Sequence, residues 1–308
     1  MVKFVDLFSG IGGFRIALER LRCECVFSSE INKFARETYE ANFNGFVHGD
    51  VTKIDEDEIP PHDLLVGGFP CQGFSIAGVS KNNSMGRKHG FAHEQGNLFF
   101  EILRILKSQR PRAFLLENVK NLLRHDKGKT WKIMQARLQD LGYSVHWKII
   151  DASLIVPQKR ERMYIVGLRD HLEFEFPDIK PITTCLADIL EDSVDEKYTL
   201  RKTWEALQKH KLRHEEAGHG FTYSIFNTNT IRTRTLTKRY YKDGSEILIE
   251  QEGKNPRRLT PRECARLMGF PESFIIPVSD TQAYQQFGNS VIPGIIEEVA
   301  KEILRVIE

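Results

Sequence analysis

The sequence predicts an α/β protein in which a parallel sheet is covered by helices and a smaller second domain follows. In the first half of the chain, short apolar runs alternate with amphipathic stretches, as they do in a sheet built from strand and helix units. After about Phe176 the pattern changes, because Pro177 and Pro181 precede a basic, Thr-rich region that includes 228–238. We therefore expect one large α/β domain and a second, smaller one.

Each element of the first domain has its own signal. Apolar runs, two of them bounded by Pro or Gly, predict buried strands over 3–7, 25–28, 63–66 and 113–116. Amphipathic spacing predicts helices over 14–21, 33–42, 98–106 and 131–141. Two later runs, 145–150 and 162–167, are close enough in the sequence to form a hairpin-like addition at the sheet edge. Helical patterns return at 261–268 and 295–307.

Length and composition exclude several protein classes. The 308 residues suffice for a large hydrophobic core, and 41% hydrophobic with 28% charged residues is ordinary for a soluble globular protein. These values argue against a disordered, collagen-like or membrane-spanning chain. The first ten residues lack the basic leader and long apolar stretch of a signal peptide, so we expect a cytoplasmic protein.

The cysteines and the charges give different information. The five cysteines are odd in number and scattered, and none forms a Cys-x-x-Cys pair, so neither a disulfide framework nor a metal site is predicted. The net charge of +2 says little about nucleic acid. Residues 201–270, however, contain 15 Lys and Arg against 8 Asp and Glu, which makes this segment basic and the remainder mildly acidic.

A glycine-rich turn, 8–13, lies directly between the first predicted strand and helix. Glycines such as Gly10 and Gly12 let a ligand approach the backbone. Glu30 ends the next strand, where an acid can bind ribose hydroxyls, and Asp50 can add a second polar contact. The glycine-rich turn and Glu30 together predict a nucleoside-containing cofactor. The absence of a strict Gly-x-Gly-x-x-Gly argues against dinucleotide binding, and a tight turn without a ligand is the alternative. A nicotinamide dehydrogenase would explain the glycine-rich turn alone but leaves the cysteine of the later loop, Cys71, unexplained.

Two reactive side chains follow predicted strands. Cys71 lies in a glycine-flanked loop just after strand 63–66, where a thiolate can meet a substrate; Pro70 and the glycines favour this over the alternative of a small core residue. Glu117 follows the strand 113–116 at the same edge of the sheet, so both side chains can face one cleft. A partly desolvated carboxyl group there holds its proton better and can act as an acid.

Two arginine groups allow alternative interpretations. Arg160 and Arg162 alternate along a predicted strand, so they point to one face and can anchor a carboxylate or a phosphate; a solvated charge run is the alternative. In 257–266, Thr260 is a predicted helix cap, with Pro261 in the first position and Glu263 three residues past the cap. The arginines of that segment either hold phosphates or brace the domains.

Five motifs in this order resemble the C5-cytosine DNA methyltransferase family: Phe-Pro-Cys-Gln, Glu-Asn-Val, Gln-x-Arg-x-Arg, Arg-x-Leu-Thr-Pro-Arg-Glu-Cys-Ala and Gly-Asn-Ser. The likeness runs from Phe4 to about Leu304. It implies a Rossmann-like sheet of the S-adenosylmethionine-dependent methyltransferases, with helices on both faces, plus a smaller target-recognition domain. The implied boundaries are 1–180 for the catalytic and cofactor-binding domain, completed by a C-terminal helix 286–308, and 181–285 for target recognition.

The resemblance implies S-adenosylmethionine as the methyl donor. The residues expected around it are Phe8, Gly10, Gly12, Glu30, Ile31, Asp50, Pro70, Leu98, Asn289, Ser290 and Val291. Ile31 departs from many relatives, in which an aromatic residue follows the acid. Stacking of the adenine there would become aliphatic packing, so the affinity for the cofactor is the quantity that this departure puts in question.

The resemblance also implies a mechanism. Cys71 adds to C6 of a cytosine that has been flipped out of duplex DNA, and Glu117 hydrogen-bonds or protonates N3, so that C5 becomes nucleophilic and accepts the methyl group. Asn118, Arg160 and Arg162 are expected to orient Glu117 and the base. The glycine-punctuated loop after Cys71 is expected to act as a lid.

The DNA contacts implied by the resemblance are Arg87 and Lys88 in that lid and Arg232, Arg234, Thr237 and Arg239 in the basic region. The segment 235–249 resembles the Dcm-type branch, whose members methylate the inner cytosine of CCWGG or CCNGG. We expect a monomer that acts on double-stranded DNA, binds no membrane, and shares its site with a restriction endonuclease without forming a stable complex with it.

Two alternatives keep the fold. One branch of the family acts on RNA, although the sizeable basic segment here favours DNA. A catalytically silent DNA-binding relative is the other alternative, and intact Cys71, Glu117 and Arg160 argue against it.

Overall fold

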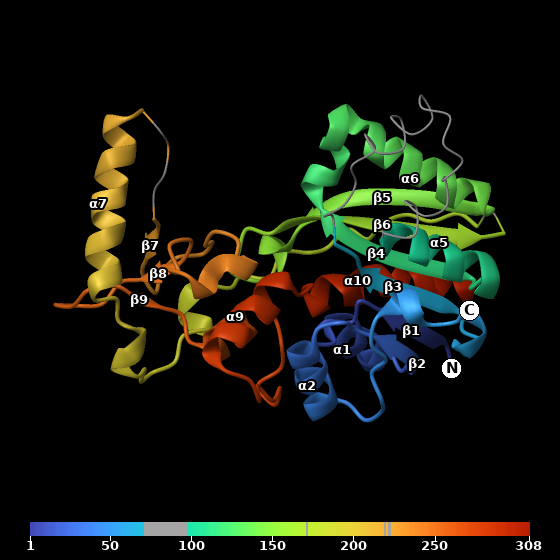
Figure 1. Ribbon diagram of the computed structural model, residues 1–308, viewed down its shortest axis with the longest axis horizontal. Coiled ribbons are helices and arrows are strands. Elements are labelled where there is room, and N and C mark those ends of the chain that lie inside the picture. The colour runs from blue at the N-terminus through green and yellow to red at the C-terminus, as the bar shows by residue number, and fades with distance from the viewer. Residues whose placement is uncertain (71–97, 171, 219, 221–222) are drawn as a thin grey trace.

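The computed structural model describes residues 1–70, 98–170, 172–218, 220 and 223–308 (Figure 1). Its centre is a six-stranded sheet with the strand order β2-β1-β3-β4-β6-β5. The strands are β1 (Lys3–Leu7), β2 (Glu24–Ser29), β3 (Leu64–Gly68), β4 (Ala113–Val119), β5 (Tyr143–Asp151) and β6 (Glu161–Arg169). All six strands agree with the sequence prediction to within three residues at each end.

The sheet is mixed. Strands β2, β1, β3 and β4 are parallel, but β6 is antiparallel to β4, and β5 is antiparallel to β6. The expected hairpin-like addition at the sheet edge is confirmed. A fully parallel sheet was not possible here, because the link between β5 and β6, residues 152–160, is shorter than the dozen or more residues that a parallel crossover needs.

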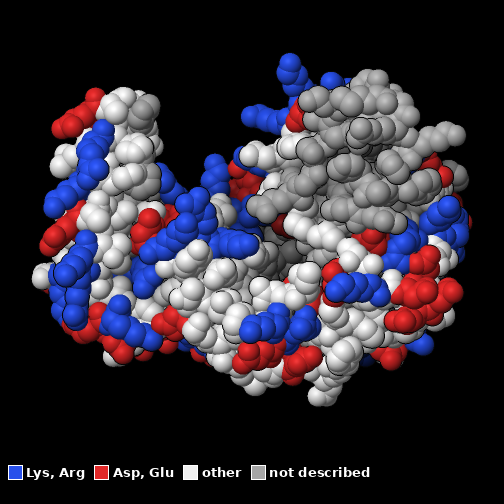
Figure 2. All heavy atoms as spheres, in the orientation of Figure 1, with Lys and Arg blue, Asp and Glu red and all other residues white. Residues whose placement is uncertain are grey.

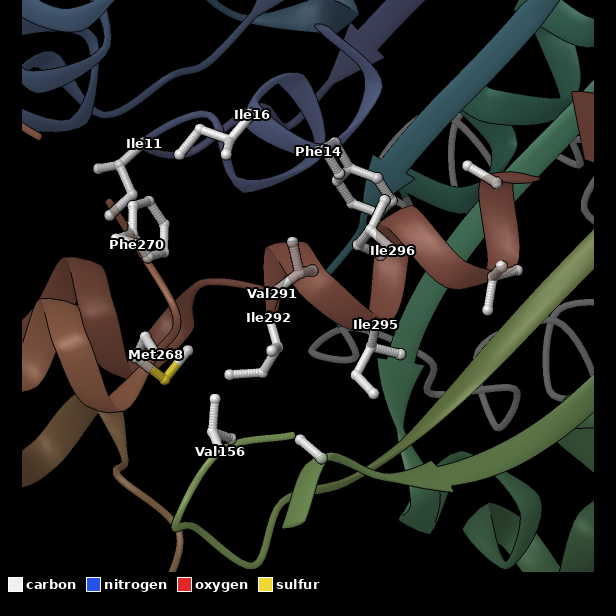
Figure 3. Packing of buried hydrophobic residues seen from close by; sticks show 14 of the residues in the cluster. Ile11, Phe14, Ile16, Val156, Met268, Phe270, Val291, Ile292, Ile295 and Ile296 are labelled. Atoms are coloured by element: carbon white, nitrogen blue, oxygen red, sulfur yellow. The ribbon is translucent and has the colours of Figure 1, made fainter. Parts of the chain in front are cut away.

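Helices cover both faces of the sheet, as predicted. Helices α5 (Leu98–Gln109) and α6 (Lys129–Asp140) pack on one face, and α1 (Gly13–Arg20) and α10 (Pro293–Ile307) on the other (Figure 1). Side chains alternate between the two faces along each parallel strand, so that Phe4 and Val5 belong to different cores. Figure 3 shows Phe14 and Ile296 packed between α1 and α10.

Helix α2 (Lys33–Asn42) begins at a side-chain cap. Asn32 Oδ1 accepts hydrogen bonds from the backbone N–H groups of Phe34 and Ala35. Short 3-10 turns join the larger elements in this half of the chain: η1 (Val51–Lys53), η2 (Glu56–Glu58), η3 (Lys120–Leu123), η4 (His125–Gly128) and η5 (Ala152–Leu154).

The later part of the chain holds a small three-stranded sheet, β7-β8-β9, whose strands have two residues each. They are β7 (Ile225–Phe226), β8 (Leu248–Ile249) and β9 (Arg257–Arg258), with turns η6 (Leu186–Asp188), η7 (Glu196–Tyr198) and η8 (Lys238–Tyr241) around them. Helix α7 (Lys202–Glu216) stands at the far end of the molecule from the large sheet (Figure 1). Leu207 attaches it to a small cluster that includes Leu248.

The core on the α10 side continues into this later part through buried side chains such as Leu236 and Tyr240. Helix α8 (Pro261–Leu267) begins with the predicted capping box, because Thr260 Oγ1 accepts from Glu263 N and the Glu263 carboxylate accepts from Thr260 N. Among the described residues, no helix has the length and apolar character needed to cross a membrane.

The expectation of one C-terminal helix over 286–308 is wrong. Helix α9 (Asp280–Asn289) ends before a three-residue extended segment, and α10 starts at Pro293. Proline disfavours helical geometry in the residue before it, and Ile292 is accordingly extended, with φ −89° and ψ 110°. The break places 290–292 between two helices instead of inside one.

Candidate active site

Strands β1, β3 and β4 are parallel neighbours, so their carboxyl ends meet at one edge of the sheet. The glycine-rich turn, the end of β3 and Glu117 all lie there. A β-carbon at Gly68 would stand 3.6 Å from Glu117 Oε2 and 3.8 Å from Val291 Cγ1. Gly68 therefore lies close both to the predicted acid and to a predicted cofactor residue from the opposite end of the chain.

Glu117 is buried inside β4, which extends two residues further than the acid itself. Arg162 Nε lies 3.1 Å from Glu117 Oε1, across the β4 and β6 pair. Burial raises the pKa of the Glu117 carboxyl above its usual range, and the positive charges of Arg162 and Arg160 oppose part of that rise. A carboxyl group in this setting holds its proton to higher pH than an exposed one, which suits an acid.

Asn118 connects this acid to the loop that follows β3. Its Nδ2 donates to the carbonyl of Phe69 at 3.1 Å, and its Oδ1 accepts from Val119 N. This bond fixes the backbone just before Pro70, which is exposed. Cys71 comes next in the sequence and lies outside the described residues, as do Arg87 and Lys88.

The glycine-rich turn has the backbone geometry of a ligand-binding loop. Phe8, Gly10 and Gly12 all have positive φ angles, of 55°, 55° and 86°. For Phe8 this left-handed conformation is strained, and such strain is concentrated at ligand sites. The Glu30 carboxylate accepts from Gly10 N at 2.9 Å and from Asn32 N at 2.7 Å, so it ties this turn to the start of α2.

Among the remaining predicted cofactor residues, Ser290 and Val291 approach this turn closely, whereas Asn289 and Ile31 are exposed to solvent. A β-carbon at Gly13 would lie 2.7 Å from Val291 Cγ2 and 3.0 Å from Ser290 Oγ, which shows how closely segment 290–291 approaches it. Asn289 is exposed at the end of α9, and Ile31 is 69% exposed.

Two further predicted residues mark the ends of this region. Asp50 lies two residues after His48, whose carbonyl oxygen accepts a hydrogen bond from Glu30 N. Asp50 Oδ1 accepts hydrogen bonds from the backbone N–H and the hydroxyl group of Thr52. Leu98 is the first residue of α5 and is partly buried against the core on that face. The Glu30 carboxylate, bound to Gly10 N of the glycine-rich turn, fits the hydroxyl groups of a nucleoside cofactor.

Arg160 acts differently from the sequence prediction for it. It precedes β6 and is only 2% exposed. Its guanidinium donates to three carbonyl oxygens: Leu236 at 3.0 Å, Gly288 at 3.2 Å and Ser290 at 2.7 Å. Arg162 thus anchors a carboxylate, as one interpretation expected, whereas Arg160 holds backbone from two distant segments. Burial lowers the pKa of the Arg160 guanidinium to about 9, so it remains charged at neutral pH.

The segment that carries the predicted DNA contacts is attached along 157–160. Thr233 N donates to Pro157 O, and Lys159 N donates to Thr233 O, both at 3.0 Å. Gln158, which is fully buried, accepts from Leu236 N through Oε1 at 2.8 Å. Sequence reasoning assigned Gln158 no role, although its place in the Gln-x-Arg-x-Arg motif was a signal.

Three of the predicted DNA contacts, Arg232, Arg234 and Arg239, are exposed. Thr237 differs, because its hydroxyl donates to Glu246 and accepts from Arg239 N at the start of η8. Figure 2 shows Lys and Arg side chains gathered in the hollow between α7 and the rest of the molecule. A duplex with its negative backbone matches this hollow in charge.

The arginines of 257–266 brace the structure. Arg257 forms a bidentate pair with buried Glu263, at 2.7 and 2.8 Å. Arg266 pairs with Glu272, and Arg262 donates to a carbonyl oxygen. Of the two interpretations offered by the sequence, the contacts within the described residues support bracing.

Sequence reasoning also gave no role to Asp6. This acid interrupts the apolar run of β1 and is fully buried, and neither of its carboxylate oxygens has a hydrogen-bond partner among the described residues. Burial raises the pKa of the Asp6 carboxyl well above its usual range. An acid inside an apolar strand was the signal available in the sequence.

Comparison with known proteins agrees with this geometry. Residues 2–305 match the family described as C-5 cytosine-specific DNA methylase. The type II methyltransferase M.DsaV of Dactylococcopsis salina is 53% identical, over 100% of this chain and 87% of that protein. M.SsoII of Shigella sonnei is 52% identical over 99% and 81%, and the DNA-cytosine methyltransferase of Escherichia coli K12 is 43% identical over 97% and 76%.

Solved structures show the same fold. The Entamoeba histolytica methyltransferase EhMeth superposes with a TM-score of 0.78 at 21% identity, covering 100% of this chain and 99% of that one. A Spodoptera frugiperda DNMT2 mutant gives 0.78 at 23% identity, over 99% and 100%. The predicted methyltransferase fold is therefore confirmed, and with the family match and the close relatives, the chain belongs to the C-5 cytosine-specific DNA methylases.

Proposed function

We propose that this DNA cytosine-5 methyltransferase works through Cys71 and Glu117, with S-adenosylmethionine as the methyl donor. The observation that carries the proposal is the position of Glu117, which is buried against Arg162 at the sheet edge, where Gly68 lies close to both Glu117 and Val291. An acid with a raised pKa is thus held next to a nucleoside-binding turn and to the backbone that leads to Cys71.

The cofactor residues have defined roles in this proposal. Glu30 and Asp50 bind hydroxyl and amino groups of the nucleoside, and the turn at Gly10 and Gly12 accommodates its approach. The segment Asn289, Ser290 and Val291 closes the opposite side, with Phe8, Ile31, Pro70 and Leu98 as further contacts. When bound, S-adenosylmethionine supplies a methyl group on a positively charged sulfur.

The reaction follows from the chemistry of these residues. The Cys71 thiolate adds to C6 of cytosine, and the electron pair of the C5–C6 bond is accommodated in the ring because Glu117 gives a proton to N3. C5 is then nucleophilic and takes the methyl group. A base then removes the C5 proton, the thiolate leaves C6, and N3 returns its proton to the Glu117 carboxylate, which restores the neutral aromatic ring. Arg162 and Asn118 hold the acid and the loop in position, and Arg160 fixes the surrounding backbone.

The substrate is a cytosine flipped out of duplex DNA, since C6 is hidden in a stacked base. In this proposal residues 1–180 with the C-terminal segment form the catalytic domain, and residues 181–285 recognise the target, with CCWGG or CCNGG as the site. Arg232, Arg234, Thr237 and Arg239 contact the DNA, together with Arg87 and Lys88. The similarity to type II enzymes supports a role beside a restriction endonuclease of the same specificity. The proposal also has the chain act in the cytoplasm as a monomer.

A transfer assay tests the proposal. Purified protein should move labelled methyl groups from S-adenosylmethionine to duplex DNA, and Cys71→Ala should abolish the transfer. Bisulfite sequencing of plasmid DNA from expressing cells identifies the base and its sequence context. Full activity of Cys71→Ala would refute the covalent mechanism.

Two controls separate the alternatives. Competition with transfer RNA distinguishes a DNA from an RNA substrate, and the proposal requires that DNA win. Covalent trapping on duplex DNA containing 5-fluorocytosine should capture the wild-type chain, because the fluorine blocks loss of the C5 substituent. A catalytically silent DNA-binding protein would bind that duplex without becoming cross-linked.

A further inference from the structure

A hollow of about 430 Å³ lies between residues 232–249, here called the recognition segment, and Lys159, in the loop just before β6. Its lining includes three cations, Lys159, Arg232 and Arg234, and one acid, Glu246. Phe226 of β7 contributes an apolar wall. We name this the recognition hollow.

The hollow has a fixed backbone on one side. Thr233 is buried and hydrogen-bonded to Pro157, and Thr235 Oγ1 donates to the carbonyl of Lys159 at 2.5 Å. Because side chains alternate along an extended segment, burial of Thr233 leaves Arg232 and Arg234 exposed on the other side. The two arginines are therefore presented from a segment whose position is set by the catalytic part of the chain.

The acid is also held in place. Thr237 Oγ1 donates to Glu246 Oε1, so the carboxylate is oriented by a neutral hydroxyl. A carboxylate offers about four lone-pair positions, so Glu246 can accept further hydrogen bonds from a ligand. It lines the same hollow as three positively charged side chains.

This combination of charges discriminates between two kinds of DNA contact. A site for backbone phosphate gains from cations and loses from a carboxylate, which repels the phosphate. The major-groove edge of a G·C pair, by contrast, presents acceptors at guanine O6 and N7 and a donor at cytosine N4. Arginine is the usual partner of guanine, and glutamate accepts from cytosine N4.

We propose that the recognition hollow binds the major-groove edge of a G·C pair in the target site, with Glu246 accepting from cytosine N4 and Arg232 donating to guanine. The inference rests on the proposed function and deepens it, since it assigns one base pair of the site to named side chains. Glu246 is then a specificity-determining residue, which was not among the DNA contacts predicted from the sequence.

The test compares kcat/KM on duplexes in which each pair of the methylated site is replaced in turn. Glu246→Gln keeps an oxygen for Thr237 but offers the side chain that pairs with adenine. At one G·C position we expect discrimination against A·T to fall by roughly 5- to 150-fold, the range of one good base contact. Arg232→Gln, at an exposed position, should relax the same position.

Glu252→Gln is the matched control, because Glu252 is exposed and does not line the hollow. Unchanged discrimination in both Glu246→Gln and Arg232→Gln would overturn the inference while the proposed function stands. An equal loss on every duplex, with a weaker salt dependence, would also overturn it, since that is the signature of a phosphate contact. Wild-type protein that methylates no duplex would refute the proposed function itself.

Discussion

Gly288→Ala tests the contact between α9 and the recognition segment. A β-carbon at Gly288 would lie 2.3 Å from the carbonyl carbon and oxygen of Thr237 and 2.5 Å from Lys238 N. Ordinary contacts begin near 3.4 Å, so the two segments must separate by about 1 Å. All three atoms belong to the backbone, and no change of side-chain rotamer can relieve the overlap.

The magnitude follows from two opposed effects. Alanine favours a helix over glycine by about 0.8–1 kcal/mol. Overpacking a closely packed site costs typically 1–3 kcal/mol, and a backbone clash belongs at the upper end. We therefore expect Gly288→Ala to lower the free energy of unfolding by about 1–2 kcal/mol. A misplacement of about 1 Å near the reacting groups can cost up to 100-fold in rate, so kcat/KM for methyl transfer should fall more than stability alone implies.

Urea unfolding measures the first effect, and methyl transfer to a duplex target measures the second. Gly220→Ala is the control, since no atom of the described residues lies within 4 Å of its β-carbon and its φ angle lies outside the left-handed region. This variant should leave both quantities near the wild-type values. A Gly288→Ala protein as stable and active as the wild type would show that α9 and the recognition segment are not in contact in the working enzyme.

Three further predictions concern single side chains. Arg257→Met removes the partner of buried Glu263, and loss of one member of a buried pair should cost about 3–5 kcal/mol in urea unfolding; a loss below 1 kcal/mol would contradict this. Burial raises the pKa of Glu117 in the folded state, so the wild type loses stability as the pH rises through that pKa. Glu117→Gln lacks this titration, so the difference in unfolding free energy between the variant and the wild type should shift in favour of the variant over that pH range. Parallel pH profiles of the two proteins would contradict the raised pKa. Ile31→Trp places at position 31 the kind of aromatic ring that follows the acid in many relatives. A stacking contact of about 1 kcal/mol should tighten S-adenosylmethionine binding roughly fivefold, as measured by calorimetry. Unchanged binding would mean that the side chain at position 31 does not touch the adenine.

The large sheet was predictable because its signals are local. The apolar runs of β1 and β3 predict these strands directly, and the glycines between β1 and α1 predict the turn that joins them. The boundaries shifted where polar residues continue a strand, as at Glu117, which lies inside β4 because the ladder with β6 extends to Val119. The helical pattern over 295–307 matches α10, whereas the single helix 286–308 implied by the resemblance overlooked the break before Pro293.

The later part of the chain was less predictable. Strands β7, β8 and β9 have two residues each, which is too short for any periodic pattern. The residues that position the site are joined over long separations in the sequence: Arg160 reaches carbonyl groups 76 and 128 residues away. No local pattern specifies such bonds, so motif order could indicate the family but not the role of Arg160.

The choice of arginine at position 160 can be explained from its partners. A buried guanidinium loses its hydration, and only good hydrogen bonds offset that cost. Arg160 has two terminal nitrogens in a fixed plane, and they reach Leu236 on one side and Gly288 with Ser290 on the other. A lysine ammonium at this position is a point charge on a flexible stem and lacks that fixed fork. Since the Glu117 carboxylate also favours the charged form of the guanidinium, the same cation links the backbone at Leu236, the backbone at Gly288 and Ser290, and the buried acid.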